Sequence, residues 1–222
     1  MSGAEADGLS HELIVSLLHD VRPDDPVLSE EGKDDAKGRL SARRVWIVDP
    51  LDGTREYAEG RTDWAVHVAL WEDGELVAGA VAGALEGAVL STADPPPVPE
   101  STARTGRPFP RLVVSRTRAP DFVDRVAVAL GGAEVMHMGS AGAKAAAVIV
   151  GFADAYVHAG GQYEWDSAAP VAVARSAGLH TSRIDGSLLR YNQPDVYLPD
   201  LVICRPELAA TILAAISHTP AG

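Results

Sequence analysis

The sequence contains a single cysteine, Cys204, in 222 residues, so no internal disulfide can form. This cysteine lies in the apolar run 201–204, a setting typical of an inert core thiol. No apolar run reaches the roughly 18 residues needed to span a bilayer. The first 18 residues also lack the basic and apolar regions of a signal peptide. These absences predict a cytoplasmic protein that makes no membrane contact.

Basic side chains are scarce: 19 Lys and Arg stand against 31 Asp and Glu, for a formal net charge of −12. They form no basic stripe, which argues against a nucleic acid polymer as a partner. A small anionic ligand is still compatible with this charge, because divalent cations bound to clustered carboxylates reverse the local sign. The hydrophobic content of 46% is ordinary for a globular core.

The sequence has no repeat with a period of 20–50 residues, and its first half is typical of a helix followed by strands. A helix is expected to follow Asp7, with Leu9, Leu13 and Leu17 at helical spacing, and to end before Pro23. After it we expect a short strand at 27–31, a mobile charged loop at 32–41, a buried strand ending at 48, a strand at 64–70 with Trp64, Val66, Val68 and Leu70 on one face, a hairpin turn at 72–74, and strands at 76–82 and 88–91. The later strands predict an antiparallel meander.

Residues 94–110 are rich in Pro, Ser, Thr and Arg and lack apolar periodicity, which is typical of a linker or long loop. We therefore predict two subdomains, 1–108 (α+β) and 109–222 (α/β), with the active site between them. In the second, strand and helix patterns alternate, which predicts an α/β layer. The expected strands are 112–115, 135–138, 155–158 and 201–204, and the expected helices are 120–130, 140–150, 167–177 and 206–217.

The central motif is the turn at which the buried strand ends, Asp49-Pro-Leu-Asp52-Gly53-Thr54. Two aspartates three residues apart on a rigid strand end can hold hard oxygen ligands close together, as Mg²⁺ requires. Gly53 lets the backbone approach a ligand, and Thr54 is expected to cap a helix whose free N–H groups accept phosphate. Taken alone, Asp-Pro and Asp-Gly are common in solvated turns, so the metal interpretation depends on further carboxylates.

Further carboxylates occur at the ends of other expected elements. Glu30 follows the short strand, and Asp166 stands near a helix start beside a tryptophan and glycines. With Asp49, Asp52 and the Leu51 carbonyl they give enough oxygen ligands for two or more Mg²⁺ ions. Glu30 and Asp166 also have plainer interpretations: Glu30 could be part of a solvated acidic pair, and Asp166 could be a helix N-cap.

Other polar residues suit the chemistry of a phosphate ester. A helix opens with Ser140 as its cap, so its free N–H groups could accept an anion while Lys144 adds charge. Asp7 with Thr54 could orient or deprotonate a water, and a paired metal site suits in-line attack of that water on phosphate. His67 is interpreted as a hydrogen-bonded sheet histidine without a catalytic role.

A competing mechanism would use the first aspartate as a nucleophile that forms an aspartyl phosphate, since Asp-x-Asp-Gly-Thr patterns serve that chemistry. In this sequence the two aspartates are three residues apart, not two. The extra residue would misplace the acid/base aspartate, so metal-assisted attack by water is the preferred hypothesis.

The motifs together resemble a known family. Ser-Glu30-Glu31, Trp-Ile-Val-Asp49-Pro-Leu-Asp52-Gly-Thr54, Gly139-Ser-Ala and Glu-Trp165-Asp166-Ser-Ala-Ala are similar to motifs of the inositol monophosphatase superfamily of Mg²⁺-dependent, lithium-sensitive phosphatases. Within it, Gly-Ser-Ala-Gly-Ala-Lys144, Gly-Gly-Gln-Tyr-Glu-Trp-Asp166 and Leu189-Arg-Tyr-Asn192 look most like the bacterial CysQ branch. Enzymes of that branch remove the 3′-phosphate of adenosine 3′,5′-bisphosphate, a by-product of sulfate assimilation.

The resemblance implies a layered α/β/α/β/α sandwich of the sugar-phosphatase type, with two or three Mg²⁺ ions and a homodimer. The implied site comprises the metal ligands Glu30, Asp49, Asp52, Asp166 and the Leu51 carbonyl, the catalytic residues Asp7, Thr54 and Glu30, and the substrate-binding residues Gly53, Thr54, Ser140 and Lys144. Family members carry one more N-terminal helix, so we expect a truncated or misassigned start that leaves Asp7 near a frayable terminus.

The leading hypothesis is therefore a Mg²⁺-dependent hydrolase acting on a small phosphate ester, adenosine 3′,5′-bisphosphate. The alternative is the same chemistry on fructose 1,6-bisphosphate or inositol monophosphate, because phosphate and metal ligands are shared across the superfamily. A third hypothesis, from another class, is a sensor that binds phosphate ligands without catalysis.

Overall fold

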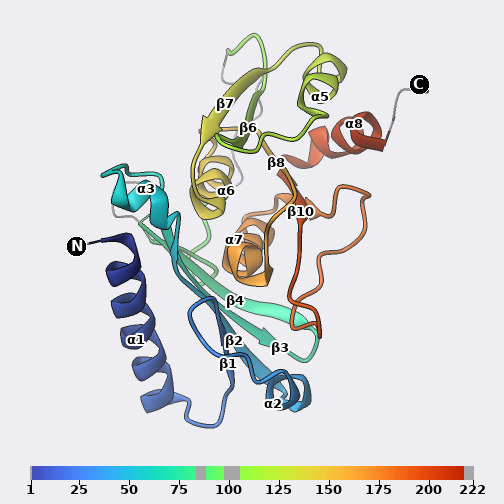
Figure 1. The fold of residues 1–222 in the computed structure, drawn as a ribbon. Coiled ribbons are helices and arrows are strands. Elements are labelled where there is room, and N and C mark those ends of the chain that lie inside the picture. Colours follow the sequence, from blue (N-terminus) through green and yellow to red (C-terminus); the bar gives the residue numbers. More distant parts are fainter. Residues whose placement is uncertain (1, 84–88, 98–105, 218–222) are drawn as a thin grey trace.

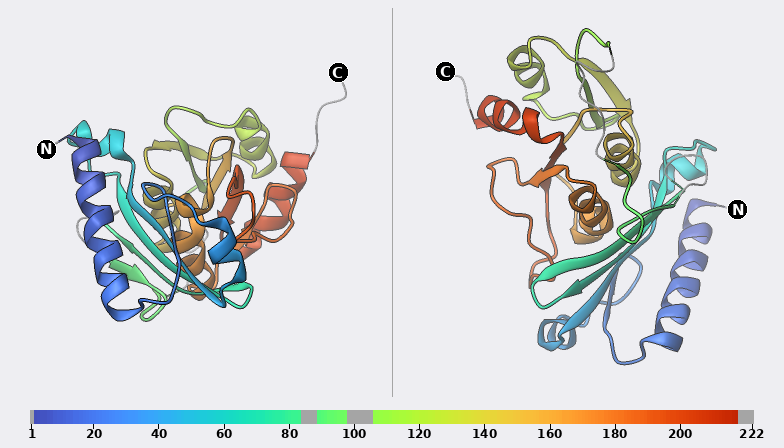
Figure 2. Two further views of the ribbon diagram at one scale, coloured as in Figure 1. Left: turned by 60° about the horizontal axis from the view of Figure 1, so that its bottom comes forward. Right: turned by 180° about the vertical axis from the view of Figure 1, so that it is seen from behind.

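The computed structural model describes residues 2–83, 89–97 and 106–217, and it places them in five layers (Figure 1). Helix α1 (Gly3–Val21) covers one face of the first sheet, and α6 (Ala141–Ile149) and α7 (Glu164–Ser176) cover the other. The second sheet follows, with α5 (Val123–Ala129) and α8 (Pro206–Ser217) beyond it (Figure 2). This arrangement confirms the expected α/β/α/β/α sandwich.

The first sheet has the strand order β1-β2-β3-β4-β5. Its strands are β1 (Val27–Ser29), β2 (Arg44–Asp52), β3 (Ala65–Glu72), β4 (Glu75–Ala82) and β5 (Val89–Ser91). The antiparallel meander expected for β3 to β5 is confirmed; β2 extends it by pairing antiparallel with β3, whereas β1 pairs with β2 in parallel. The expected third meander strand began at residue 88, which lies outside the described residues.

The end of β2, which carries the motif from Asp49 to Thr54, is irregular. Asp49 pairs with His67 and Asp52 with Ala65, so the register shifts between the two aspartates. Pro50 has no N–H to give to the ladder, and a local break in pairing is the usual result. The break turns both carboxylates out of the regular alternation and leaves them at the rim of the sheet.

The more deeply buried face of β3 carries small residues. Ala65, His67 and Ala69 are buried, whereas Val66 and Val68 on the opposite face are only half-buried. Small side chains allow α7 to approach the sheet closely. The expected face of Trp64, Val66, Val68 and Leu70 therefore exists, but it is not the one that packs against α7.

Close helix packing predicts a stability effect at Gly79 of β4. A Cβ at this position would lie 2.8 Å from the Cβ of Ala172 and 3.0 Å from the carbonyl oxygen of Ala169. Gly79→Ala is therefore expected to destabilise the fold by about 1–3 kcal/mol through overpacking. Gly8→Ala in α1 meets no atom within 4 Å and should stabilise the helix by about 1 kcal/mol. Equal melting temperatures for the two variants would contradict this packing.

Helix α1 begins earlier than expected, so Asp7 lies within it and does not precede it. Ser2 and Glu5 form a capping box that satisfies the first turn, and Asp7 is 5% exposed. The aspartate is therefore held in a capped, ordered turn, not a frayed one. The leucines at positions 9, 13 and 17 lie on the outer side of the helix and are 55–61% exposed.

Two further segments differ from expectation. The charged segment 32–41 contains a short helix, α2 (Ala36–Ser41), anchored by the fully buried Arg39. Arg39 binds Asp34 and also donates to Asn192 Oδ1 and the Gln193 carbonyl, 153 and 154 residues away. A loop expected to be mobile is thus tied to the second half of the chain.

The start of α7 also differs, because Tyr163 is its N-cap. Asp166 is the third residue of the helix, and its carboxylate accepts a hydrogen bond from the Tyr163 N–H at 2.7 Å. The expected N-cap at Asp166 was therefore wrong. The earlier start places Pro170 inside the helix.

The second sheet has the order β7-β6-β8-β10-β9. Its strands are β6 (Arg111–Ser115), β7 (Glu134–Met138), β8 (Ala155–Ala159), β9 (His180–Ser182) and β10 (Asp200–Cys204). Four strands confirm the sequence prediction, and β9 was not expected. Cys204 is buried and free. Within the described residues, no helix is long and apolar enough to cross a membrane.

One apolar core joins the two halves of the chain, with Leu28 and Val45 from the first and Val171 and Ile203 from the second. The division at residues 108 and 109 stays a prediction. Residues 98–105 of the expected linker lie outside the described residues.

Candidate metal and phosphate site

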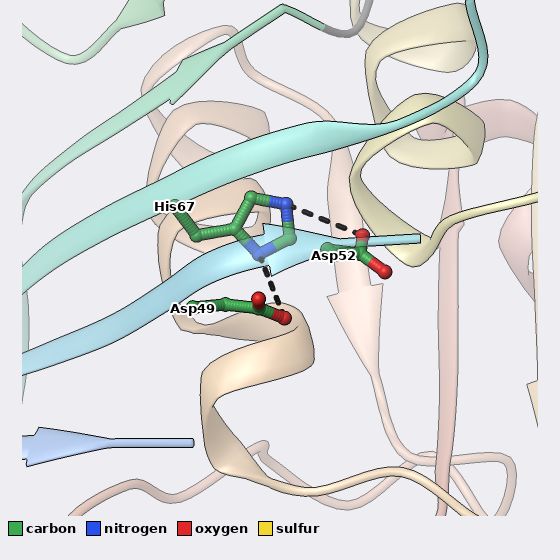
Figure 3. A group of neighbouring side chains, drawn as sticks. All are labelled: Asp49, Asp52 and His67. Atoms are coloured by element: carbon green, nitrogen blue, oxygen red, sulfur yellow. Dashed lines mark ion pairs between the residues drawn. The ribbon is translucent and has the colours of Figure 1, made fainter. Parts of the chain in front are cut away.

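The aspartates of the β2 turn meet a histidine from the neighbouring strand (Figure 3). His67 Nε2 lies 3.4 Å from Asp52 Oδ2, and His67 Nδ1 lies 4.0 Å from Asp49 Oδ2. One ligand atom from each of the three residues lies within 4.8 Å of the others. The three side chains are buried, and together they could hold a metal ion.

His67 was not expected at the site. Its Nδ1 lies 3.1 Å from the Trp165 carbonyl, which can only accept, so Nδ1 carries the proton and Nε2 is an acceptor. Nε2 has no hydrogen-bond partner, yet it faces the Asp52 carboxylate. Two acceptors facing each other in a buried site need a proton or a cation between them, and this observation fits a metal ion.

The other predicted carboxylates face the same place. The pKa of Asp49 is raised well above its usual range by burial and by the charges of Asp52, Glu30 and Asp166. Burial and the charges of Asp7, Asp52 and Glu31 raise the pKa of Glu30 to about 7. Burial and the charges of Asp52 and Glu30 raise the pKa of Asp166 to about 8. Such mutual repulsion arises only among close groups. The structure therefore brings together Glu30, Asp49, Asp52 and Asp166, all hard oxygen donors of the kind that Mg²⁺ prefers.

Asp7 and Thr54 form a contact beside this cluster. The Thr54 hydroxyl lies 3.2 Å from Asp7 Oδ2 and 3.0 Å from the Leu51 carbonyl oxygen. The second oxygen of Asp7, Oδ1, is buried and has no hydrogen-bond partner. Burial raises the pKa of Asp7, and the nearby Glu31 charge adds to the effect. A carboxyl group with a free oxygen and a raised pKa is suited to accept a proton.

Thr54 begins a short helix, α3 (Thr54–Ala58), but does not cap it as expected. The N-cap is Gly53, with φ 90°. A Cβ at Gly53 would lie 3.1 Å from Ser140 Cβ, so glycine is needed for both the backbone conformation and the close approach. Gly53 thereby brings the β2 turn and the start of α6 together.

The first turn of α6 binds the Asp52 carboxylate. The Ser140 hydroxyl and the Gly142 N–H each donate to Asp52 Oδ2 at 2.6 Å. Ser140 has φ 36°, which is unusual for a residue with a side chain. The Lys144 ammonium, 3% exposed, donates to the carbonyl oxygens of Gly139 and Ser140. Lys144 thus supports the turn itself, and burial lowers its pKa to about 8.

Asp63 is a second support that the sequence did not reveal. It accepts the Gly139 N–H at 2.7 Å and is held by a two-point ion pair with Arg61. Asp63 and Gly139 are 76 residues apart in the sequence, and the fold brings them into contact.

A cavity of about 260 Å³ opens beside the cluster. Asp52, Gly53, Ser140, Lys144 and Asp166 line its inner end. The turn after β6 and the residues His158, Gly161 and Gln162 also line it, so polar groups from both sheets converge on one space. Clustered carboxylates, helix N–H groups and cationic side chains together suit an anionic ligand bound with metal ions.

Comparison with known proteins agrees with this chemistry. A sequence model described as "Inositol monophosphatase family" matches residues 4–220. The chain is 50% identical over 222 residues to a "3'-phosphoadenosine 5'-phosphate phosphatase" of Mycobacterium tuberculosis, covering 97% of this chain and 82% of the relative.

Two further matches point the same way. Escherichia coli "3'(2'),5'-bisphosphate nucleotidase CysQ" is 32% identical over 200 residues, covering 87% of this chain and 80% of the relative. The crystal structure of CysQ from Bacteroides thetaiotaomicron matches with a TM-score of 0.77 at 27% identity, covering 90% of this chain and 83% of that one.

Proposed function

Because the chain belongs to the inositol monophosphatase family, we propose that it removes the 3′-phosphate of adenosine 3′,5′-bisphosphate to give AMP. The chain is a phosphatase of this family. The substrate assignment follows the mycobacterial relative, which is named for this activity and shares half of its residues with the chain. The observation that carries the proposal is the buried carboxylate cluster at the inner end of a polar cavity.

The residues that would hold Mg²⁺ are Glu30, Asp49, Asp52, Asp166 and the Leu51 carbonyl. Their number suits two or three ions. When bound, Mg²⁺ neutralises phosphate charge and acidifies water. His67 Nε2, which lies 3.4 Å from Asp52 Oδ2 and has no hydrogen-bond partner, would add a nitrogen ligand beside these oxygen ligands.

The chain's own groups position and activate the attacking water. The Thr54 hydroxyl donates a hydrogen bond to Asp7. A lone pair on the Thr54 oxygen is then left to accept a hydrogen bond from the water. Asp7 Oδ1 is free to take the proton that the water loses as it attacks phosphorus. Glu30, with its pKa near 7, is a second group able to exchange a proton near neutral pH.

The phosphate would be held by the first turns of α3 and α6. Gly53, Thr54 and Ser140 are the predicted contacts, and Lys144 adds positive charge at the same turn. In the structure the Ser140 hydroxyl and the Gly142 N–H bind Asp52, and a phosphate held at this turn would share these donors with the carboxylate. Oriented donors of this kind stabilise charge as it develops on phosphate oxygens.

Fructose 1,6-bisphosphate and inositol monophosphate are the alternative substrates, because the groups so far assigned contact metal and phosphate only. A sensor without catalysis is the alternative from another class. The two subdomains, 1–108 and 109–222, and a homodimer are further proposals. Limited proteolysis would test the division, and the molar mass in solution would test the dimer.

The proposal predicts phosphate release from adenosine 3′,5′-bisphosphate that requires Mg²⁺ and falls with millimolar lithium. Comparison of kcat/KM with fructose 1,6-bisphosphate and inositol 1-phosphate identifies the substrate. Release from the sugar phosphate at the higher kcat/KM would overturn the nucleotide assignment. Tight nucleotide binding with Mg²⁺ but no release would instead support the sensor.

A further inference from the structure

Four cationic side chains line the cavity: Arg55, Arg116, Arg118 and Lys144. Among the described residues, the charged group of one of them, Arg118, has neither an ion pair nor a hydrogen bond. Ion pairs with Glu56 and Glu59 engage the first two at 2.8–3.3 Å, and the lysine donates to two backbone carbonyls. Across the parts of the chain that the structure describes, no carboxylate pairs with Arg118. Its charge is therefore available to an anionic ligand.

The fold makes room for Arg118 inside the cavity. The N–H groups of Thr117 and Arg118 lie 3.4 and 3.2 Å from Ser115 Oγ, which fixes the turn after β6. The guanidinium lies against Gly161, where a Cβ would come within 2.2 Å of Nη1. Gly161 also has φ 71°. A glycine at this point is thus what allows the arginine to occupy its position.

Two buried acceptors lie beside it and lack a donor. His158 Nε2 lies 2.8 Å from the Gly160 carbonyl and must donate, so His158 Nδ1 is an acceptor. Gln162 Nε2 donates to Tyr156 Oη at 3.0 Å, which leaves Gln162 Oε1 as an acceptor. Both side chains are 4% exposed, line the cavity, and have these atoms unpartnered. Burial, with the charges of Lys144 and Arg118, lowers the pKa of His158 to about 4, so it stays neutral.

These groups define what a ligand must bring to this end of the cavity. An unpaired buried acceptor is costly, so a good ligand supplies a hydroxyl or amino donor. A free guanidinium is suited to a phosphate, which it can bind through two N–H groups. A bisphosphorylated nucleoside offers a second phosphate and several donors, whereas an inositol monophosphate lacks the second anion.

We propose that Arg118 binds the second phosphate of the substrate, while His158 and Gln162 accept hydrogen bonds from its hydroxyl or amino groups. This inference rests on the proposed function, because it assigns the part of the same cavity that distinguishes substrates. Arg118 is thereby a specificity-determining residue that favours bisphosphates over monoesters.

The test is the ratio of kcat/KM for adenosine 3′,5′-bisphosphate to that for adenosine 3′-monophosphate. Arg118→Gln should lower this ratio about tenfold to hundredfold, mainly through KM for the bisphosphate, because charge-assisted hydrogen bonds are lost. Arg43→Gln removes the same charge just before β2, where Arg43 pairs with Glu72 and Asp73 of the β3–β4 hairpin outside the cavity, and should leave the ratio unchanged.

A pair of glycine variants tests the geometry separately from the charge. Gly161→Ala should lower the ratio by displacing the guanidinium. Gly160→Ala is the matched control, because Gly160 has a similar φ of 91° but open space around the new Cβ. Both variants carry backbone strain, so a general loss of stability would affect them alike.

The outcomes separate this inference from the function on which it rests. A wild-type preference for the bisphosphate that survives Arg118→Gln would overturn the role of Arg118 and leave the proposed function intact. Equal turnover of both nucleotides by the wild type would also overturn it. Release from neither would overturn the proposed function, and calorimetric titration of both nucleotides into wild type and Arg118→Gln would then test Arg118 directly.

Discussion

Asp52→Asn is expected to abolish phosphate release, by about a thousandfold or more, without unfolding the protein. Asp52 contacts residues from both halves of the chain, because His67 lies 3.4 Å from the same oxygen that accepts hydrogen bonds from Ser140 and Gly142. Asparagine keeps the shape but removes the charge that a divalent cation requires. Its amide N–H₂ group would also be a poor partner for the α6 N–H donors.

The measurement combines kcat with thermal unfolding and Mg²⁺ titration. Removing one carboxylate relieves the repulsion that raises the pKa of Asp49 and Asp166, so the metal-free variant should melt no lower than the wild type at pH 8. Asp73→Asn, at the exposed β3–β4 hairpin, is the control for a loss of one charge. An Asp52→Asn protein that keeps most of its activity would contradict the metal assignment.

The part of the site formed by the β2 turn was predictable because its residues lie close together in one short segment of sequence. Asp49, Asp52 and Gly53 follow a buried strand, and the break at Pro50 fixes their approximate geometry. Glu30 could be added because it directly follows the short apolar strand β1. Similar logic located most strands and helices of the second half, since each has a clear apolar period and flanking glycines or prolines.

What the sequence could not reveal depends on contacts between distant segments. His67 enters the site because it pairs with Asp49 across two strands, a register that alternation alone does not specify. Asp63 supports Gly139 from 76 residues away, and Arg39 is tied to Asn192 across 153 residues. Residue types predict such partners only weakly, because aspartate and arginine are usually solvated.

Helix starts were missed for a different reason. Asp166 and Thr54 are both good N-cap residues, yet in the fold the caps are Tyr163 and Gly53. Tertiary contacts decided: Gly53, in a left-handed conformation, lies close to Ser140 before Thr54, and Asp166 faces the carboxylate cluster from inside its helix. The local preference of a residue was overridden at the functional site, where such conflicts are expected.

Stability without metal is expected to fall as pH rises from 5 to 8, and Mg²⁺ should restore it most strongly at pH 8. The pKa of Asp166 is raised to about 8 and that of Glu30 to about 7 in the folded protein, because both are buried beside other carboxylates. In the unfolded chain both groups have ordinary values near 4. Between the unfolded and folded pKa values, the folded state holds protons that the unfolded state has released. The stability that these protonated carboxyl groups contribute below pH 4 is therefore lost as the pH rises through 7 and 8.

The size of this effect follows from one buried carboxyl group. A carboxyl held about two pKa units above its ordinary value costs roughly 3 kcal/mol once it ionises. For a domain of this size that corresponds to a melting temperature lower by roughly 5–10 °C at pH 8 than at pH 5. Melting curves in chelator and in millimolar Mg²⁺ across this range would measure it. A Mg²⁺-induced shift that does not grow with pH would contradict a cation site built from these carboxylates, because only their ionised forms bind the metal.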